Sequence, residues 1–168
     1  MTLLITYAST RGSTREVAET IAASLREHGL DVDLKAAAEV EDVNGYDGVV
    51  LGAAIYMGHA HVDVRRLLRR CRKELSSLPL AVFAMGPRTS SEDDLAGSRK
   101  QLDHDLAKLP ELEPFSIAIF GGVVDPAKLH FPFNRMAASD ARDWDAIEAW
   151  ALELAATFAP VPAAALAP

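Results

Sequence analysis

Stretches suited to buried strands alternate along the chain with stretches of helical periodicity. Four apolar runs and one alternating segment are typical of strands; they are 3–8, 31–34, 49–54, 79–85 and 116–120, of which 31–34 is the alternating one. Between the first two, Val17, Ile21 and Leu25 recur at the spacing of one helical face, and Gly29 follows as a stop. The chain therefore alternates between β and α elements from its first residues.

Further helices are expected between the later strands. We predict a short helix over 36–43, a longer one over 62–76, and another that begins after a cap at Ser91 and ends at 109. Asp143 can cap a last helix, in which Trp144 and Trp150 fall on the apolar face. The region 123–142 is rich in proline and aromatic residues and shows no regular period, so it forms either a lid or only a connection.

This alternation predicts a single α/β domain over residues 1–159, followed by a flexible, proline-rich tail over 160–168. Helices that connect parallel strands cover both faces of the sheet, so we expect a three-layer, doubly wound architecture. Right-handed crossovers leave few orders for five strands, of which we favour 2-1-3-4-5. In such a sheet a ligand binds where the order reverses, at the ends of the first, third and fourth strands.

The turn between the first strand and the first helix is the strongest candidate for a ligand site. Backbone N–H groups at the start of a helix lie at the positive end of its dipole and attract an anion such as phosphate. The loop adds hydroxyl donors, a cation and a glycine that permits close approach; its residues are Ser9, Thr10, Arg11, Gly12, Ser13 and Thr14. Without a lysine it suits a single terminal phosphate better than a triphosphate with its metal.

An alternative reading of the same loop requires no ligand. Ser13 and Glu16 have the spacing of a capping box, in which side chains close the helix end.

Charge and cysteine content restrict the class of protein. A net charge of −7 argues against nucleic acid as the main partner, because a phosphate backbone requires clustered cations. No stretch is long and apolar enough to be a transmembrane segment, and no signal peptide is evident. The single cysteine, Cys71, excludes an internal disulfide and fits a reducing compartment. We therefore expect a cytoplasmic protein.

Four segments carry a resemblance to a known family. YASTRGST (7–14) resembles the phosphate-binding loop of flavodoxins, which hold flavin mononucleotide (FMN). YDGVVLGAAIYMGH (46–59), FAMGP (83–87) and RDWDAI (142–147) look like a narrower subgroup that contains the menaquinone-dependent protoporphyrinogen IX oxidases. The resemblance covers most of residues 2–158 and implies a flavodoxin-like fold with FMN as the cofactor.

The resemblance also implies roles for three loops. The first loop, Ser9 to Thr14, would bind the phosphate of FMN. A second loop would run along the isoalloxazine ring; its residues are Ala54, Ile55, Tyr56, Met57 and Gly58. Within it, the Gly58 peptide is a candidate for rearrangement on reduction, and Tyr56 either stacks on the ring or is a partly buried loop residue. Met85, Gly86 and Pro87 would close the other side through backbone contacts.

The implied function is electron transfer or oxidoreduction of a small acceptor such as a quinone, with a redox partner protein as another possible acceptor. One alternative is a protoporphyrinogen IX dehydrogenase, and another is a non-enzymatic module that binds an anion or a partner protein; a homodimer is left open. The sequence differs from the family pattern in two places. The region 123–142 is shorter than in the menaquinone-dependent enzymes, and the loop after the fourth strand lacks the aromatic residue that many flavodoxins stack on the flavin. His59 is either a proton donor to the reduced flavin or a quinone, or an ordinary loop histidine. His59 and His61 offer only two ligands, so no metal site is expected.

Overall fold

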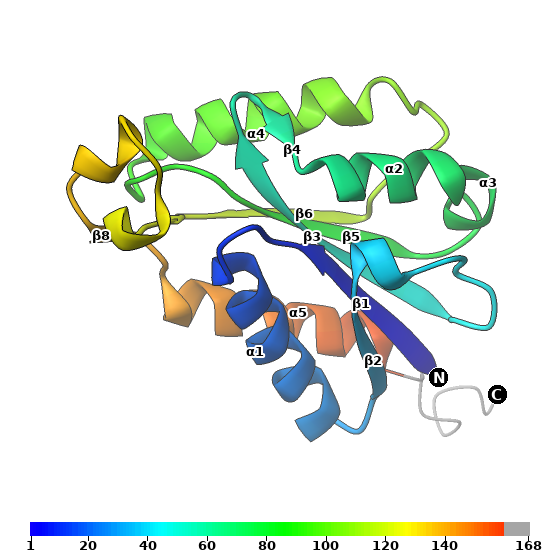
Figure 1. Cartoon of the computed structure of the whole chain (residues 1–168). Helices are drawn as coiled ribbons and strands as arrows, with labels where there is room; N and C mark the ends of the chain where they lie inside the picture. The colour runs from blue at the N-terminus through cyan, green and yellow to red at the C-terminus, as the bar shows by residue number, and fades with distance from the viewer. Residues whose placement is uncertain (160–168) are drawn as a thin grey trace, which may run out of the picture.

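A parallel sheet runs through the centre of the molecule (Figure 1), and the structure, a computed structural model, describes residues 1–159. The strands lie side by side in the order β2-β1-β3-β5-β6, and each neighbouring pair is parallel. Their bounds are β1 Thr2–Ala8, β2 Asp31–Ala36, β3 Gly48–Tyr56, β5 Leu80–Met85 and β6 Ser116–Phe120. These are the five strands expected from the sequence, so the predicted order 2-1-3-4-5 is confirmed. The tail predicted over 160–168 lies outside the described residues.

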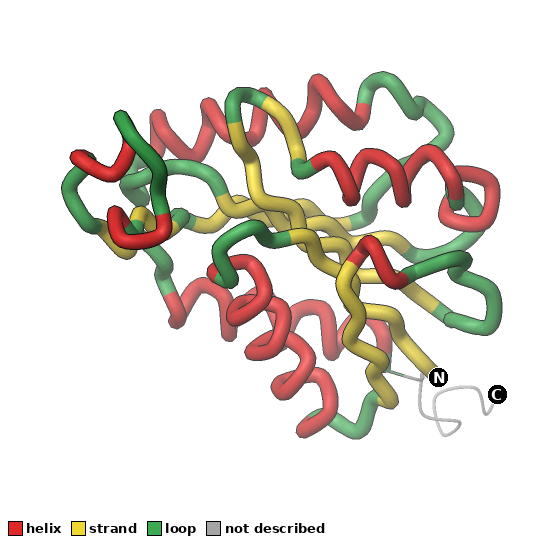
Figure 2. The backbone as a smooth tube through the Cα atoms, viewed as in Figure 1, coloured by secondary structure: helices red, strands yellow, loops and turns green. Residues whose placement is uncertain are grey.

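Helices cover both faces of this sheet (Figures 1 and 2). Helices α1 (Ser13–Glu27) and α5 (Trp144–Phe158) pack on one face, and α2 (Val62–Arg70), α3 (Arg72–Leu75) and α4 (Glu92–Leu106) pack on the other. Each face has its own apolar cluster because successive side chains of a strand point to opposite sides. Leu4 of β1 belongs to the α2–α4 cluster, whereas Leu3 and Ile5 belong to the α1–α5 cluster. The predicted three-layer α/β architecture is confirmed.

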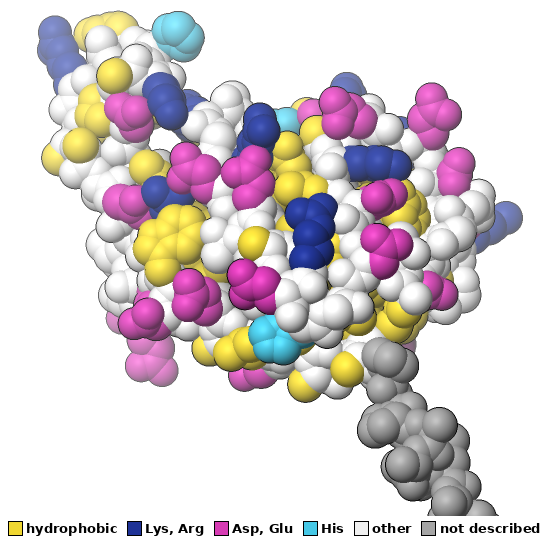
Figure 3. Space-filling model, turned by 90° about the horizontal axis from the view of Figure 1, so that it is seen from below, with side chains coloured by type: hydrophobic (Ala, Val, Ile, Leu, Met, Phe, Trp, Pro, Cys, Tyr) yellow, Lys and Arg dark blue, Asp and Glu magenta, His cyan; other side chains and the backbone are white. Residues whose placement is uncertain are grey.

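The outer surface agrees with the net charge of the chain. Figure 3 views the molecule from the side of α1 and α5, and on this face acidic side chains are spread widely while basic side chains are fewer. None of the helices in residues 1–159 is long and apolar enough to cross a membrane.

Strand β3 continues into a hairpin that the sequence did not predict. It extends to Tyr56 and pairs antiparallel with the short strand β4 (His59–Ala60). The two connecting residues, Met57 and Gly58, have φ angles of 51° and 82°. Two successive left-handed residues are the signature of a type I′ turn, whose twist suits a two-residue hairpin. The expectation that the strand ends at Ala54 was therefore wrong.

Three helical predictions also need correction. The helix expected over 36–43 is only a 3₁₀ turn, η1 (Ala37–Glu39), and the helix expected over 62–76 is divided into α2 and α3 at Cys71. Cys71 is buried, and burial raises the pKa of its thiol, which fits a packing role. Trp144 is 37% exposed rather than part of the core, because it begins α5 and lies under the guanidinium of Arg142 at 4.8 Å.

The region 123–142 leaves the central sheet after β6 and leads into α5. Strand β7 (Val123–Val124) pairs antiparallel with β8 (Ser139–Asp140), and two 3₁₀ turns, η2 (Pro126–Lys128) and η3 (Phe133–Arg135), lie between them. The excursion lies at the end of the molecule where α1 begins (Figure 1). It is therefore placed beside the loop that the sequence singled out.

Candidate functional site

A cleft of about 350 Å³ opens at the carboxyl ends of β1, β3 and β5, which is within the size range of small-molecule sites. Its walls come from the β1–α1 loop, the β3–β4 hairpin, the loops after β5 and β6, and the region 123–136. Ten of the residues predicted for the site line it: Ser9, Thr10, Arg11, Ser13, Ala54, Ile55, Tyr56, Met57, Met85 and Gly86. The structure thus brings together three loops that are far apart in the sequence.

The other four predicted residues lie beside the cleft. Gly12 and Thr14 belong to the β1–α1 loop and the first turn of α1, behind the lining residues. Gly58 and Pro87 line an open groove between the hairpin and α4, which adjoins the cleft through Gly86.

The β1–α1 loop leaves the start of α1 without a side-chain cap. Gly12 is the N-cap residue with φ 93°, and its N–H donates to Ser9 Oγ at 2.9 Å. The first helical hydrogen bond runs from the N–H of Glu16 to the Gly12 carbonyl at 3.0 Å, so the N–H groups of the first three helical residues have no acceptor within the helix. The capping-box alternative was wrong, because Ser13 is inside the helix and the Glu16 carboxylate is bound by Arg142.

Thr14 is a buried hydroxyl at this same helix start. Its side chain is completely buried, and within residues 1–159 its Oγ1 has no hydrogen-bond partner. Leaving a buried hydroxyl unpartnered costs about 1–3 kcal/mol. A phosphate held by the neighbouring N–H groups would supply acceptor oxygens, so the residues of this loop fit the terminal phosphate of FMN.

Cationic side chains surround the loop. The Arg11 guanidinium lies over the Tyr56 ring, 5.5 Å from its centroid, and Lys128 Nζ donates to the Arg11 carbonyl at 3.3 Å. His61 Nε2 is 3.2 Å from Thr10 Oγ1. Arg11 and Lys128 thus place two cations at the loop, although Asp125 lies 3.9 Å from Lys128 and the whole chain is acidic.

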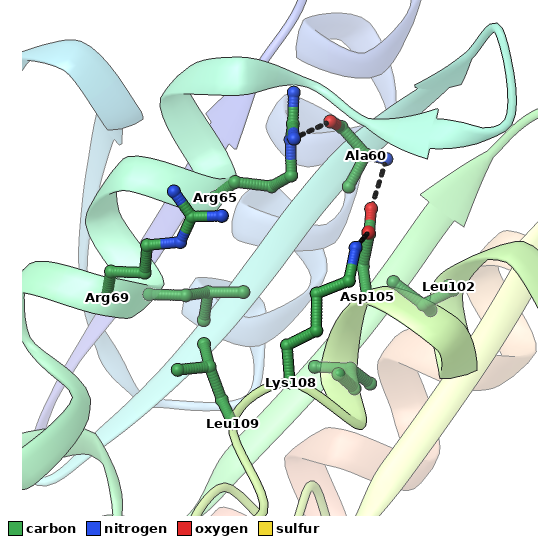
Figure 4. Close-up of a pocket in the computed structure, with 9 residues that line it drawn as sticks. Ala60, Arg65, Arg69, Leu102, Asp105, Lys108 and Leu109 are labelled. Atoms are coloured by element: carbon green, nitrogen blue, oxygen red, sulfur yellow. Dashed lines mark hydrogen bonds and ion pairs between the residues drawn. The ribbon is translucent and has the colours of Figure 1, made fainter.

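The hairpin is anchored from behind by α4. Figure 4 shows the Asp105 carboxylate pointing at the backbone of Ala60, whose N–H donates to it at 2.9 Å, and Lys108 reaching the same carboxylate at 2.9 Å. Arg65 adds a hydrogen bond to the Ala60 carbonyl at 3.0 Å. Burial acts to raise the pKa of Asp105, but the hydrogen bonds from Lys108, Ala60 and His59 together lower the pKa below its ordinary value.

His59 lies on this rear side and does not line the cleft. Its Nδ1 is 3.3 Å from Asp105 Oδ1, whereas His61 is the histidine that lines the cleft. The spacing of the two histidines could not distinguish them, because the register of the unpredicted hairpin decides which ring faces α4.

Several cleft residues were missed by the sequence reasoning. Arg88 follows β5, and the region 123–136 contributes Leu129, Phe133 and Met136. Arg88 Nη2 lies 3.6 Å from Met136 Sδ, so the two walls touch. Phe133 places an aromatic side chain at the cleft, although the loop after β5 has none. The only signal in the sequence was the concentration of aromatic and apolar residues near 129–136.

Comparison with known proteins decides the family. The family model for the flavodoxin domain matches residues 4–137. The chain belongs to the flavodoxin domain family. FMN is the cofactor of this family, and the fold and the position of the cleft agree with it.

Curated relatives of this flavodoxin-domain protein include an enzyme of Escherichia coli. The protoporphyrinogen IX dehydrogenase [quinone] of Escherichia coli K12 is 32% identical over 87 residues, which are 51% of this chain and 48% of that protein. The chain thus aligns with about half the length of the curated relatives that it matches.

Solved structures share the fold at low identity. A cysteine-to-serine mutant of flavodoxin from Pseudomonas aeruginosa superimposes with a TM-score of 0.64 at 20% identity, covering 95% of this chain and 100% of that one. The rubredoxin oxygen:oxidoreductase of Desulfovibrio gigas gives a TM-score of 0.63 at 16% identity, covering 93% of this chain and 35% of that one. Flavodoxin 1 from Bacillus cereus gives 0.57 at 16% identity, covering 94% and 97%.

Proposed function

We propose that this protein binds FMN in the cleft and works in electron transfer, either as a carrier for a redox partner protein or as an oxidoreductase of a small acceptor such as a quinone. FMN, when bound, supplies the redox chemistry by accepting and releasing electrons. The protein's task is to hold the cofactor, to exclude water and to leave one edge accessible. The observation that carries the proposal is the buried, unpartnered hydroxyl of Thr14 beside the free N–H groups of α1.

The phosphate would be held by the β1–α1 loop, from Ser9 to Thr14. Backbone N–H groups and hydroxyls are its donors, and the α1 dipole adds to the attraction. Because Gly12 has a left-handed φ and open space where a Cβ would be, its backbone can approach an anion closely.

The isoalloxazine ring would be held by the hairpin residues 54–58 and by Met85, Gly86 and Pro87. Gly58 has a positive φ and open space where a Cβ would be, so its peptide can rearrange without a steric barrier from a side chain. The anchoring of the next residues, His59 and Ala60, by Asp105 confines such a rearrangement to the turn.

An absorbance spectrum and an FMN titration test the proposal. The FMN-free protein should quench the fluorescence of added FMN stoichiometrically, and the purified complex should be yellow and reversibly reducible. A protein that leaves FMN fluorescence unchanged at excess protein would support the alternative of a module that binds a partner or another anion.

Oxidation of protoporphyrinogen IX is the second candidate function. It is favoured by the 32% identity with the Escherichia coli enzyme, which covers only about half of either chain. An anaerobic assay with protoporphyrinogen IX and a quinone distinguishes this enzyme activity from a carrier function. A carrier loaded with FMN would not transfer electrons from protoporphyrinogen IX to the quinone.

A further inference from the structure

We infer that Lys128, from the region 123–136, is part of the phosphate site and supplies the ammonium group that the β1–α1 loop lacks. This inference rests on the proposed binding of FMN. It assigns to the region between β6 and α5 a direct part in holding the cofactor's phosphate.

The position of Lys128 is fixed by contacts with two parts of the site. Lys128 ends the turn η2, and its Nζ donates to the carbonyl of Arg11, which is 117 residues away in the sequence. The same Nζ is 3.9 Å from Asp125 Oδ2, and Asp125 lines the cleft. The ammonium group therefore lies between the cleft wall and the β1–α1 loop.

The loop's own cation is engaged elsewhere. The guanidinium of Arg11 lies over the Tyr56 ring, on the side of the loop that would face the flavin ring. The next basic residue, Arg15, is paired with Glu19 at 2.8 Å. Lys128 is the ammonium that the contacts place on the loop backbone itself.

The charge of a phosphate monoester favours this role, even though the Asp125 carboxylate lies 3.9 Å from the same Nζ. A phosphate monoester carries close to two negative charges near neutral pH, and a helix dipole provides the equivalent of only about half a positive charge. An ammonium group has three N–H donors, and the Arg11 carbonyl accepts one of them. The remaining donors can bind phosphate oxygens without displacing the contact that positions the side chain.

The test compares two ligands that differ only in the phosphate. FMN and riboflavin carry the same ring system, so each is titrated by fluorescence quenching into the wild type, Lys128→Gln, Lys128→Arg and the control Lys73→Gln, at low and high salt. Lys73 is an exposed lysine of α3, and its replacement makes the same change in net charge. Lys128 is itself 56% exposed, so its replacement should not impair folding.

Lys128→Gln should weaken FMN binding about fivefold at low salt, with the difference shrinking at high salt, as for a partly exposed charge pair. Riboflavin binding should be unchanged, and Lys128→Arg and Lys73→Gln should bind FMN like the wild type. Equal FMN affinity of Lys128→Gln and the wild type would overturn the inference alone, as would an equal loss for both ligands. A wild type that binds neither ligand would overturn the proposed function and this inference with it.

Discussion

Replacement of Thr14 by valine should affect stability and cofactor binding in opposite directions. Valine keeps the branched shape of threonine and replaces the hydroxyl by a methyl group. In the FMN-free protein Thr14 is fully buried and its hydroxyl lacks a partner within the described chain, so the replacement removes a buried polar group and loses no hydrogen bond. In the proposed FMN complex the same replacement would remove a donor to the phosphate.

The magnitudes follow from these two environments. An unpartnered buried hydroxyl costs about 1–3 kcal/mol, so Thr14→Val should stabilise the FMN-free protein by about 1 kcal/mol once imperfect packing is allowed for. Hydrogen bonds to charged groups contribute about 1.5–3 kcal/mol, so the FMN affinity should fall by roughly tenfold to a hundredfold.

Two measurements on one variant check both signs. Urea unfolding of the FMN-free protein gives the free energy of unfolding, and fluorescence quenching gives the dissociation constant of FMN. Thr6→Val is the matched control: Thr6 in β1 is also fully buried with an unpartnered hydroxyl, but it lies within the sheet rather than at the helix start. This control should be stabilised to a similar degree and should bind FMN like the wild type.

Two results would refute the reasoning. If Thr14→Val were less stable than the wild type while Thr6→Val was more stable, the Thr14 hydroxyl would have an important partner in the FMN-free protein. If its FMN affinity were unchanged, the first turn of α1 would not be where the phosphate binds.

Asp105→Asn should lower the free energy of unfolding by about 1–3 kcal/mol at neutral pH, because it removes a buried acceptor charge that ties α4 to the hairpin. Because the pKa of Asp105 is lowered in the folded state, the stability that its carboxylate contributes is present above about pH 4 and is lost as the pH falls through the folded pKa. The difference in free energy of unfolding between the variant and the wild type, measured with urea, should therefore become smaller on acidification. Gly52→Ala should destabilise the protein by about 1–3 kcal/mol, because the added Cβ would lie 2.3 Å from the Phe83 ring. Gly97→Ala in α4, where the added Cβ meets open space, should stabilise the protein by up to about 1 kcal/mol, and thermal unfolding measures both changes. Phe133→Ala should weaken FMN and riboflavin about equally, by about three- to tenfold in quenching titrations, because it removes aromatic area from the cleft wall and no charge.

The sheet could be predicted from the sequence because its strands are short and most of them are buried on both faces. A run such as Val49 to Ala54 between turn residues has few other interpretations, and the alternation of strands and helices restricts the topology. Since the carboxyl ends of these strands meet at one edge, the strand order predicted that the loops after β1, β3 and β5 lie together at the cleft.

The hairpin could not be predicted, because its turn lacks the usual residue signal. A type I′ turn favours Asn-Gly or Asp-Gly, and here a methionine occupies the first left-handed position. The anchor for β4 is Asp105, which comes from a helix 45 residues later in the sequence. The buried partner of a polar helix residue cannot be identified until the packing is known. For this reason the sequence could not show that His59 faces α4 and that His61 lines the cleft.

Whether the region 123–142 is a lid or a connection could not be decided for a similar reason. Its contacts with the rest of the chain are now known. At one end Lys128 contacts the β1–α1 loop, and at the other Arg142 binds both Asp140 of β8 and Glu16 of α1. The hydrogen bonds that Arg142 donates to Asp140 outweigh burial and raise the pKa of Arg142, so this guanidinium stays charged and offsets the one carboxylate in the first turn of α1. The first contact ends on the candidate phosphate loop, and the second ends on the turn of α1 that follows this loop. A displacement of this wall of the cleft would therefore remove a cation from the loop and leave Glu16 uncompensated next to it, so the wall and the phosphate site should respond to FMN as a single unit.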